Sequence, residues 1–340
     1  MTSVNAKPIL SIVAPCYNEE ESVSEFVRRA AAAARACAGS NFEIVLVDDG
    51  SKDGTWNLIE SLSLVVPQIV GVRLLRNYGH QMAATAGLTT ASGERVLLID
   101  ADLQDPPELV SDMMAVMDQG ADVVYGRRIR RNGETWFKRM TAAAFYRMLS
   151  QLASVQIPQD TGDFRLMNRR ITDILVAMPE QHRFIRGMVS WIGGRQVALD
   201  YERDARFAGV TKYPFLKMVR FAVDALTSFS TAPLRISTYV GMGTAMVALV
   251  MLVYSLFRWV SGATIEGWAS LMVALTFFSA IQLIALGVIG EYLGRMVQQG
   301  KGRPSFIIDH VMRRETALGE GIVAPKKKTS TAARTRSKAY

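Results

Sequence analysis

The stretch RVLLIDADLQDPPE, residues 95–108, places an apolar run directly before two aspartates, Asp100 and Asp102. Pro106 and Pro107 then open a helical stretch, where proline is tolerated in the first turn. Similar apolar runs alternate with helical stretches along the first part of the chain. The runs lie at 9–14, 43–47, 69–74, 95–99 and 121–125, and the helical stretches include 20–37 and 107–117. This alternation predicts an α/β domain built on a mostly parallel sheet.

Polar residues follow three of these predicted strands. Ligands of parallel sheets bind beyond the carboxyl ends of the strands, so we expect the three ends to form one crevice. A dinucleotide site would need a G-x-G-x-x-G turn after the first strand. The sequence there is PCYNEEE, which has no glycine, and this disfavours oxidoreductase chemistry. The residues at the three ends are Pro15, Tyr17, Asn18 and Glu19, then Asp48, Asp49, Gly50 and Ser51, then Asp100, Ala101 and Asp102.

The aspartates after the fourth run suit a divalent cation. Asp100 and Asp102 supply carboxylate oxygens, and Gln104 adds a neutral oxygen. Such ligands favour Mg²⁺ or Mn²⁺, which share their coordination with substrate phosphates. A D-x-D pair alone is equally typical of two solvated acids. The apolar strand before it and the second acidic pair, Asp48 and Asp49, favour the metal interpretation.

Composition excludes several classes of protein. The chain has 340 residues, 49% of them hydrophobic, and a formal net charge of +8, so it is not a disordered chain. Two cysteines and three histidines are too few for a disulfide scaffold or a Cys/His zinc cluster. The basic stretch 311–340 has no apolar period and predicts a disordered tail. Contact with anionic lipid and simple solvation both account for its charge, whereas a nucleic-acid role is not favoured.

Two uncharged apolar stretches, 236–257 and 268–290, are long enough to cross a membrane. Basic residues lie mainly in the flanking segments and only Arg258 lies in the loop, which predicts that both termini are cytoplasmic at the plasma membrane. Gly290 and Gly294 have a spacing that allows helices to associate, or are a chance pair. The predicted divisions are a catalytic domain at 1–211, an interfacial segment at 212–235, two membrane helices within 236–290 and a basic tail at 291–340. Amphipathic stretches at 134–155 and 213–225 are expected on the bilayer surface or, alternatively, in the core.

Six motifs in order, VAPCYNEEES, VLVDDGSKDGT, LLRNYGHQMAATAG, LLIDADLQDPPE, GRRIRRNGETWFKR and DTGDFRLMNRR, carry a family resemblance. Over roughly residues 10–299 the chain resembles family 2 glycosyltransferases of the polyprenyl-phosphate sugar synthase type. The resemblance implies a GT-A fold and transfer of a sugar from a nucleotide sugar to a polyprenyl phosphate on the cytoplasmic membrane face. It also implies a homo-oligomer, with a tetramer suggested by the relatives.

The resemblance also assigns roles in donor binding. It implies that Asp100, Asp102 and Gln104 hold the metal on the donor diphosphate. A turn followed by a helix cap is the alternative for the DDGS segment. The residues implied in contact with the donor nucleotide are Pro15, Tyr17, Glu19, Asp48, Asp49, Arg76, Asp100 and Ala101.

For the acceptor, a phosphate monoester is mostly dianionic at pH 7, so it needs cations more than a base. The candidates are Arg127, Arg128, Arg139, Arg206 and Lys212, each of which is otherwise a solvated surface charge. Asp163 matches the carboxylate that bacterial relatives place as a base, with Asp160 as the second candidate and a loop cap as the alternative for either. A dianionic acceptor leaves Asp163 to orient it or to take up a residual proton. Direct displacement inverts the anomeric carbon, and UDP-glucose is the first candidate donor.

Two other functions would use a similar crevice. A processive polysaccharide synthase should carry a Q-x-x-R-W motif, and QHRFIRG at 181–187 departs from it. A non-enzymatic membrane scaffold that senses a nucleotide would tolerate neutralisation of Asp102, whereas a synthase would not.

Overall fold

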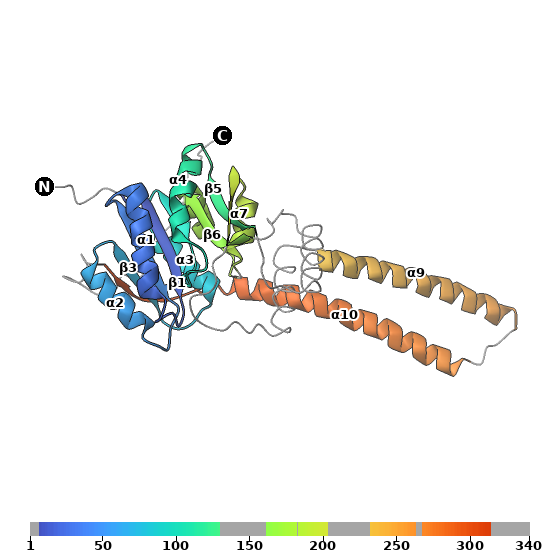
Figure 1. Cartoon of the computed structure of the whole chain (residues 1–340). Helices are drawn as coiled ribbons and strands as arrows, with labels where there is room; N and C mark the ends of the chain where they lie inside the picture. Colours follow the sequence, from blue (N-terminus) through green and yellow to red (C-terminus); the bar gives the residue numbers. More distant parts are fainter. Residues whose placement is uncertain (1–6, 130–160, 182, 203–231, 263–266, 314–340) are drawn as a thin grey trace, which may run out of the picture.

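The computed structural model describes residues 7–129, 161–181, 183–202, 232–262 and 267–313. An α/β domain lies at one end, and two long helices run side by side away from it (Figure 1). The predicted interfacial stretches 134–155 and 213–225 lie outside the described residues, as does the basic tail from residue 314.

The α/β domain is built on one eight-stranded sheet with the order β7-β5-β6-β4-β1-β2-β3-β8. Its centre, β4-β1-β2-β3, is parallel, β7 pairs parallel with β5, and β6 and β8 run antiparallel to their neighbours. This confirms the predicted fold class. The strands are β1 (Leu10–Cys16), β2 (Phe42–Asp48), β3 (Ile69–Leu74), β4 (Arg95–Leu98), β5 (Val123–Arg128), β6 (Thr161–Asn168), β7 (Gln196–Tyr201) and β8 (Ile308–Met312).

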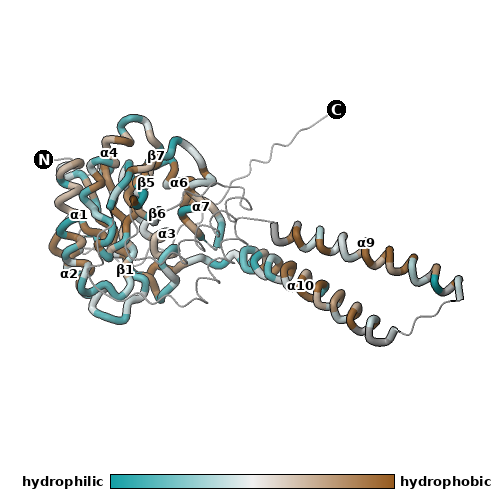
Figure 2. Tube along the Cα trace, turned by 45° about the vertical axis from the view of Figure 1, so that its right-hand side comes forward, coloured by the Kyte–Doolittle hydropathy of each residue, from teal (hydrophilic) through white to brown (hydrophobic). Residues whose placement is uncertain are grey.

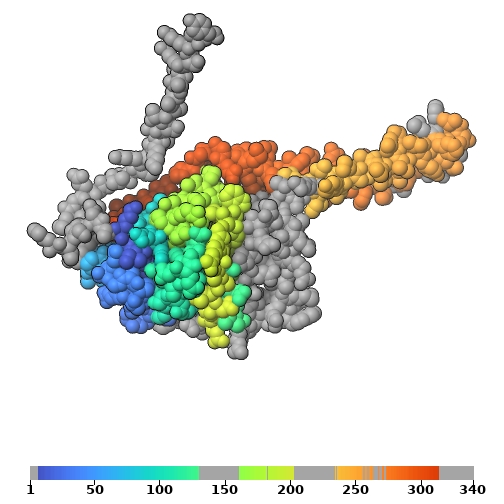
Figure 3. All heavy atoms as spheres, turned by 90° about the horizontal axis from the view of Figure 1, so that it is seen from above, coloured from blue at the N-terminus to red at the C-terminus, as the bar shows by residue number. Residues whose placement is uncertain are grey.

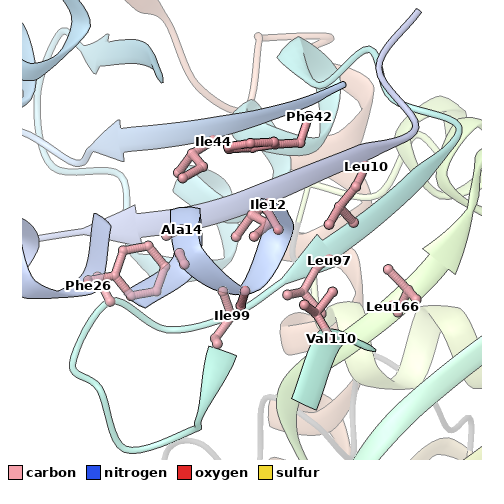
Figure 4. Close-up of a cluster of buried hydrophobic side chains, with 14 of the residues drawn as sticks. Leu10, Ile12, Ala14, Phe26, Phe42, Ile44, Leu97, Ile99, Val110 and Leu166 are labelled. Atoms are coloured by element: carbon pink, nitrogen blue, oxygen red, sulfur yellow. The ribbon is translucent and has the colours of Figure 1, made fainter. Parts of the chain in front are cut away.

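Helices cover both faces of the sheet because the central strands are apolar on both sides. Along β1, Ile12 packs into one buried cluster and its neighbour Val13 into the other, as the two-residue period of a strand requires. Figure 4 shows the first cluster, in which Phe26 of α1 and Val110 of α4 lie near β1 and β4. Each fully buried large apolar side chain contributes about 1.5–3 kcal/mol. The first face carries α1 (Val23–Ala38), α2 (Thr55–Val65), η1 (Pro107–Leu109) and α4 (Val110–Asp118); the second carries α3 (His80–Thr90), α6 (Arg169–Ala177) and α7 (Ile185–Ile192).

The two long helices are α9 (Ala232–Val260) and α10 (Trp268–Gly300). Their apolar windows are not buried inside the protein, and Figure 2 shows hydrophobic residues along both. The 33 residues of α10 span about 50 Å, more than the ~30 Å hydrocarbon core of a bilayer. The helix therefore continues past the predicted end at Gly290. An added Cβ at Gly290 or Gly294 would meet no described atom within 4 Å, so none of the described side chains of α9 packs on this glycine pair.

After α10 the chain returns to the α/β domain, which the sequence did not indicate. Residues Ile308–Met312 form β8, an edge strand antiparallel to β3 with Val72 opposite Val311. The segment assigned to the tail therefore contributes a strand to the sheet. Strands from before α9 and from after α10 therefore belong to one sheet.

Candidate active site

Loops at the carboxyl ends of β1 and β2 are joined by hydrogen bonds. The Asp49 amide donates to the Cys16 carbonyl at 2.9 Å. In the loops themselves, the Asn18 amide donates to Ser51 Oγ at 3.0 Å, and the Lys52 amide donates to Asn18 Oδ1 at 2.9 Å. Asn18 has a φ of +54°, a conformation that asparagine tolerates better than most residues. The sequence DDGS therefore forms a loop that is tied to the end of β1.

The two aspartates of this loop have different partners. Asp49 is buried and its two carboxylate oxygens accept the amides of Tyr78, at 2.7 Å, and Gly79, at 2.9 Å. Burial raises the pKa of Asp49, although the two amides oppose that shift. Asp48 Oδ1 accepts the Ser51 amide at 3.2 Å, whereas its Oδ2 is buried and has no hydrogen-bond partner in the described part of the chain. Asp48 Oδ2 is thus an acceptor that a ligand N–H or hydroxyl can satisfy.

Gly50 brings this loop against the one after β3. Its φ is +67°, and an added Cβ would lie 2.6 Å from the backbone carbon of Arg76 and the backbone nitrogen of Asn77. Only glycine fits such a contact in this conformation. The amides of Tyr78 and Gly79, which follow directly, are thereby held against Asp49.

The other predicted nucleotide contacts lie near the carboxyl ends of β1, β3 and β4. Tyr17 is 43% exposed just beyond β1, and Pro15 is buried within that strand. Glu19 accepts a hydrogen bond from Ser22 at 2.7 Å. The exposed Arg76 stacks its guanidinium 4.1 Å from the ring centre of Tyr78, and Ala101 is buried between the two metal-candidate aspartates.

Asp100, Asp102 and Gln104 lie in the turn that follows β4. The side chain of Asp100 is 31% exposed, Asp102 is nearly buried, and Asp102 Oδ1 accepts the Gln104 amide at 3.2 Å. Burial raises the pKa of Asp100 to about 6, and a bound cation favours its ionised form. The described residues contain no cluster of three or more His, Cys, Asp or Glu side chains that could hold a metal. Two carboxylates are too few for a closed protein site, and Mg²⁺ or Mn²⁺ held by them would take its other ligands from a substrate diphosphate and water.

Asp163 on β6 faces the start of α3. His80 Nε2 lies 3.4 Å from Asp163 Oδ2 and 3.4 Å from Asp100 Oδ1, so it bridges the two carboxylates. Burial lowers the pKa of His80, but the hydrogen bond to Asp163 and the charge of Asp100 outweigh burial and raise the pKa to about 9. Gln81 donates to Asp163 Oδ2 at 2.7 Å and accepts the Ile185 amide at 2.9 Å. These contacts connect β4, β6 and the start of α7 through the first two residues of α3.

Two arginines also surround Asp163. Arg186 on α7 and Arg165 on β6 place Nη2 at 3.8 and 4.0 Å from Asp163 Oδ1. Burial would raise the pKa of Asp163, but the hydrogen bond with His80 and the charge of Arg186 hold it well below its usual range. Such a carboxylate is a weak base at neutral pH. Its surroundings favour a role in orienting charged groups.

Arg128 belongs to a second buried group. Its Nη2 lies 3.4 Å from both oxygens of Asp105, and its Nε donates to the Tyr201 hydroxyl at 3.1 Å. The Tyr201 hydroxyl in turn donates to Asp105. Asp105 lies three residues after Asp102, so this group fixes the end of the metal-candidate turn against β5 and β7.

Arg127 does not join this group. It points to the other side of β5 and forms an exposed ion pair with Asp200, with Arg127 Nη2 2.8 Å from Asp200 Oδ2. The remaining candidates fall outside the described residues: Arg139, Asp160, Arg206 and Lys212.

Side chains of the QHRFIRG segment contact the residues around α6 and the segment after α10. Gln181 Nε2 donates to the Arg303 carbonyl at 2.9 Å. Arg183 donates to four carbonyls in and just after α6, those of Leu175, Val176, Met178 and Glu180.

The sequence interpretation missed His80, Gln81, Asp105, Arg165, Arg186 and Tyr201. His80 and Gln81 lie in a quoted motif, where a glycine before a polar pair could have marked a helix start aimed at the crevice.

The described residues thus combine an α/β domain, a D-x-D turn after a parallel strand and an apolar helical hairpin, the features expected of a GT-A glycosyltransferase with a membrane hairpin. Residues 11–175 match glycosyl transferase family 2, and residues 232–296 match the GtrB C-terminal hairpin. The chain belongs to glycosyl transferase family 2.

Relatives resemble the chain over most of its length. The uncharacterized glycosyltransferase YkcC of Bacillus subtilis is 44% identical over 88% of this chain and 92% of its own. The prophage bactoprenol glucosyl transferase homolog of Escherichia coli is 37% identical over 89% of this chain and 99% of its own. The bactoprenol glucosyl transferase of Shigella phage SfV is 37% identical over 88% of this chain and 97% of its own.

Proposed function

We propose that the protein transfers glucose from UDP-glucose to undecaprenyl phosphate at the cytoplasmic face of the plasma membrane, with inversion at the anomeric carbon. Relatives that share over a third of the residues are named bactoprenol glucosyl transferases, which supports the lipid acceptor and the sugar. The observation that carries the proposal is the bridge by His80 between Asp100 and Asp163. It joins the candidate donor-diphosphate turn to a carboxylate surrounded by cations.

On the donor side, Asp48 Oδ2 accepts a hydrogen bond from the nucleoside, since it is a buried oxygen at the end of β2 that has no partner in the described residues. Asp100, Asp102 and Gln104 would hold Mg²⁺ or Mn²⁺, which would supply Lewis-acid stabilisation of the departing diphosphate. The protonated His80 offsets the charge of the carboxylates around the diphosphate and keeps Asp100 oriented.

On the acceptor side, the attacking group is a phosphate oxygen, which is already ionised at neutral pH. No strong base is needed, which agrees with the lowered pKa of Asp163. Arg128, held by Asp105 and Tyr201, orients one of the two phosphate groups, and charge-assisted hydrogen bonds give it both strength and direction. Asp163 keeps His80 and Arg186 in place. The phosphate oxygen attacks the anomeric carbon as the bond to the diphosphate breaks, so a single displacement inverts the configuration.

The hairpin supports the location of the reaction. Because β8 follows α10 and joins the same sheet as β1, the α/β domain and the end of the hairpin lie on one side of the membrane, which requires an even number of crossings. Basic residues near that side, such as Arg295, Lys301 and Arg303, favour the cytoplasm. The polyprenyl phosphate headgroup is accessible at that surface.

The test uses membranes that contain the full chain, undecaprenyl phosphate, Mg²⁺ and a panel of radiolabelled nucleotide sugars. Label in the organic phase is counted for the wild type, for Asp102→Asn and for Asp112→Asn, an exposed acid on α4 that serves as the matched control. We expect EDTA-sensitive label from UDP-glucose in the wild type and in Asp112→Asn, and none in Asp102→Asn. Donor binding without lipid label from any sugar would overturn the proposal.

A further inference from the structure

The segment that follows α10, residues 303–313, lies along the α/β domain and contacts the elements that carry the site. We call it the strap. In Figure 3 the orange-red end of α10 and the chain after it run beside the light green residues near 180. The strap is the only described connection from the end of α10 to the sheet.

At its beginning the strap contacts the loop before α7. The Arg303 carbonyl accepts the hydrogen bond from Gln181 Nε2 at 2.9 Å. Four residues later, the Ile185 amide donates to Gln81 Oε1, and Arg186 lies 3.8 Å from Asp163. The first contact of the strap therefore lies next to the residues that orient Asp163.

In its middle the strap contacts the end of β3. The Leu75 amide donates to the Ile307 carbonyl at 3.0 Å, three residues before Tyr78. Phe306 and Ile308 pack against the same buried cluster as Tyr78, which also contains Ile185. The loop whose amides bind Asp49, and which leads into His80 and Gln81, is thus held on one side by the strap.

At its far end the strap reaches the other end of α3. Arg313 donates to the Thr90 carbonyl at 3.1 Å and lies 3.5 Å from Glu43 Oε2. Glu43 is buried and accepts hydrogen bonds from Ser11 Oγ at 2.7 Å and from the Ser92 amide at 2.6 Å. Contacts near both ends of α3 constrain the helix whose first turn builds the site.

We infer that the strap is a positioning element of the active site: the return of the chain from the membrane hairpin sets the geometry of the loop after β3 and of the start of α7. A glycosyltransferase domain cut off before residue 232 would lack this element. The kinetic consequence rests on the proposed function, whereas the structural coupling does not.

The test measures hydrogen–deuterium exchange in the full-length protein in detergent, followed in peptides that contain the amides of Tyr78, Gly79 and Ile185. Phe306→Ala removes packing from the strap, and Val110→Ala removes a buried side chain of α4 on the opposite face of the sheet. Both are compared at one temperature below unfolding. We expect Phe306→Ala to accelerate exchange of these amides about tenfold, because local opening exposes them, and Val110→Ala to leave them unchanged.

A second pair of variants avoids buried positions. Gln181→Ala removes only the hydrogen bond to Arg303, and Gln299→Ala removes an exposed amide on α10 as the matched control. We expect faster exchange at Ile185 and a lowered kcat, with little change in donor KM, in Gln181→Ala alone. The inference would be overturned by equal amide exchange in Phe306→Ala and Val110→Ala. It would also be overturned if Gln181→Ala exchanged the Ile185 amide at the wild-type rate. A wild type that transfers no sugar would instead contradict the proposed function and leave the exchange experiment decisive for the strap.

Discussion

Gly50→Ala tests whether the contact between two loops holds the donor site. Gly50 has a φ of +67°, and an alanine there costs about 1–2 kcal/mol for the left-handed backbone alone. Its Cβ would also lie 2.6 Å from backbone atoms of Arg76 and Asn77, which cannot rotate away as a side chain can. Overpacking of this kind costs about 1–3 kcal/mol more. We therefore expect Gly50→Ala to lower the free energy of unfolding by about 2–5 kcal/mol, which corresponds to a melting midpoint about 10 °C lower for a domain of this size.

The displaced loop carries the amides of Tyr78 and Gly79 that bind Asp49. Weakening these bonds by about 1.4 kcal/mol in the donor complex raises the donor KM about tenfold. The assay measures thermal unfolding in detergent together with donor KM in membranes. Gly39→Ala is the matched control, because Gly39 also has a positive φ, +62°, but an added Cβ there meets nothing within 4 Å.

We expect Gly39→Ala to lower stability through backbone strain and to leave the donor KM unchanged. If the two variants raise the donor KM equally, or if Gly50→Ala leaves it unchanged, the loop contact does not position the donor site.

Three further predictions concern the crevice and its surroundings. Asp102→Asn should lower sugar transfer at least about 1000-fold, because the donor diphosphate lacks its cation in this variant. For the same reason EDTA should abolish wild-type transfer until Mg²⁺ or Mn²⁺ is restored. Transfer that survives both the substitution and EDTA would contradict this prediction. Gln81→Met should lower kcat about 10–100-fold with little change in donor KM, since Asp163 and the Ile185 amide lose their shared partner; steady-state kinetics check it. Arg183→Ala should lower the free energy of unfolding by about 2 kcal/mol, through lost bonds to carbonyls near α6, as measured by denaturant unfolding.

The central sheet could be predicted because its strands are buried on both faces and read as continuous apolar runs. The acidic residues at their ends then follow from the geometry of parallel strands, and the structure places Asp49 after β2 and Asp100 after β4, the two strands on either side of β1. The choice between Arg127 and Arg128 could not be predicted. Adjacent residues of a strand point to opposite faces, and only the register of β5 with β7 shows which one meets Asp105.

Two other features depend on contacts distant in sequence. His80 and Gln81 follow a glycine at the start of a helix, but their partners come from β4, β6 and α7, which no local pattern connects. The strand β8 is short, at an edge, and mostly exposed, so it lacks the apolar period that marks the other strands. Its pairing with β3 becomes evident only in the folded protein.

Mass spectrometry of the lipid product tests the central claim most directly. Membranes that contain the full chain are incubated with UDP-glucose, undecaprenyl phosphate and Mg²⁺, and the lipid fraction is analysed. Attack by the acceptor phosphate oxygen on the anomeric carbon predicts undecaprenyl monophosphate that has gained one hexose. A lipid diphosphate sugar, or a polymer with no lipid-linked hexose, would contradict the account.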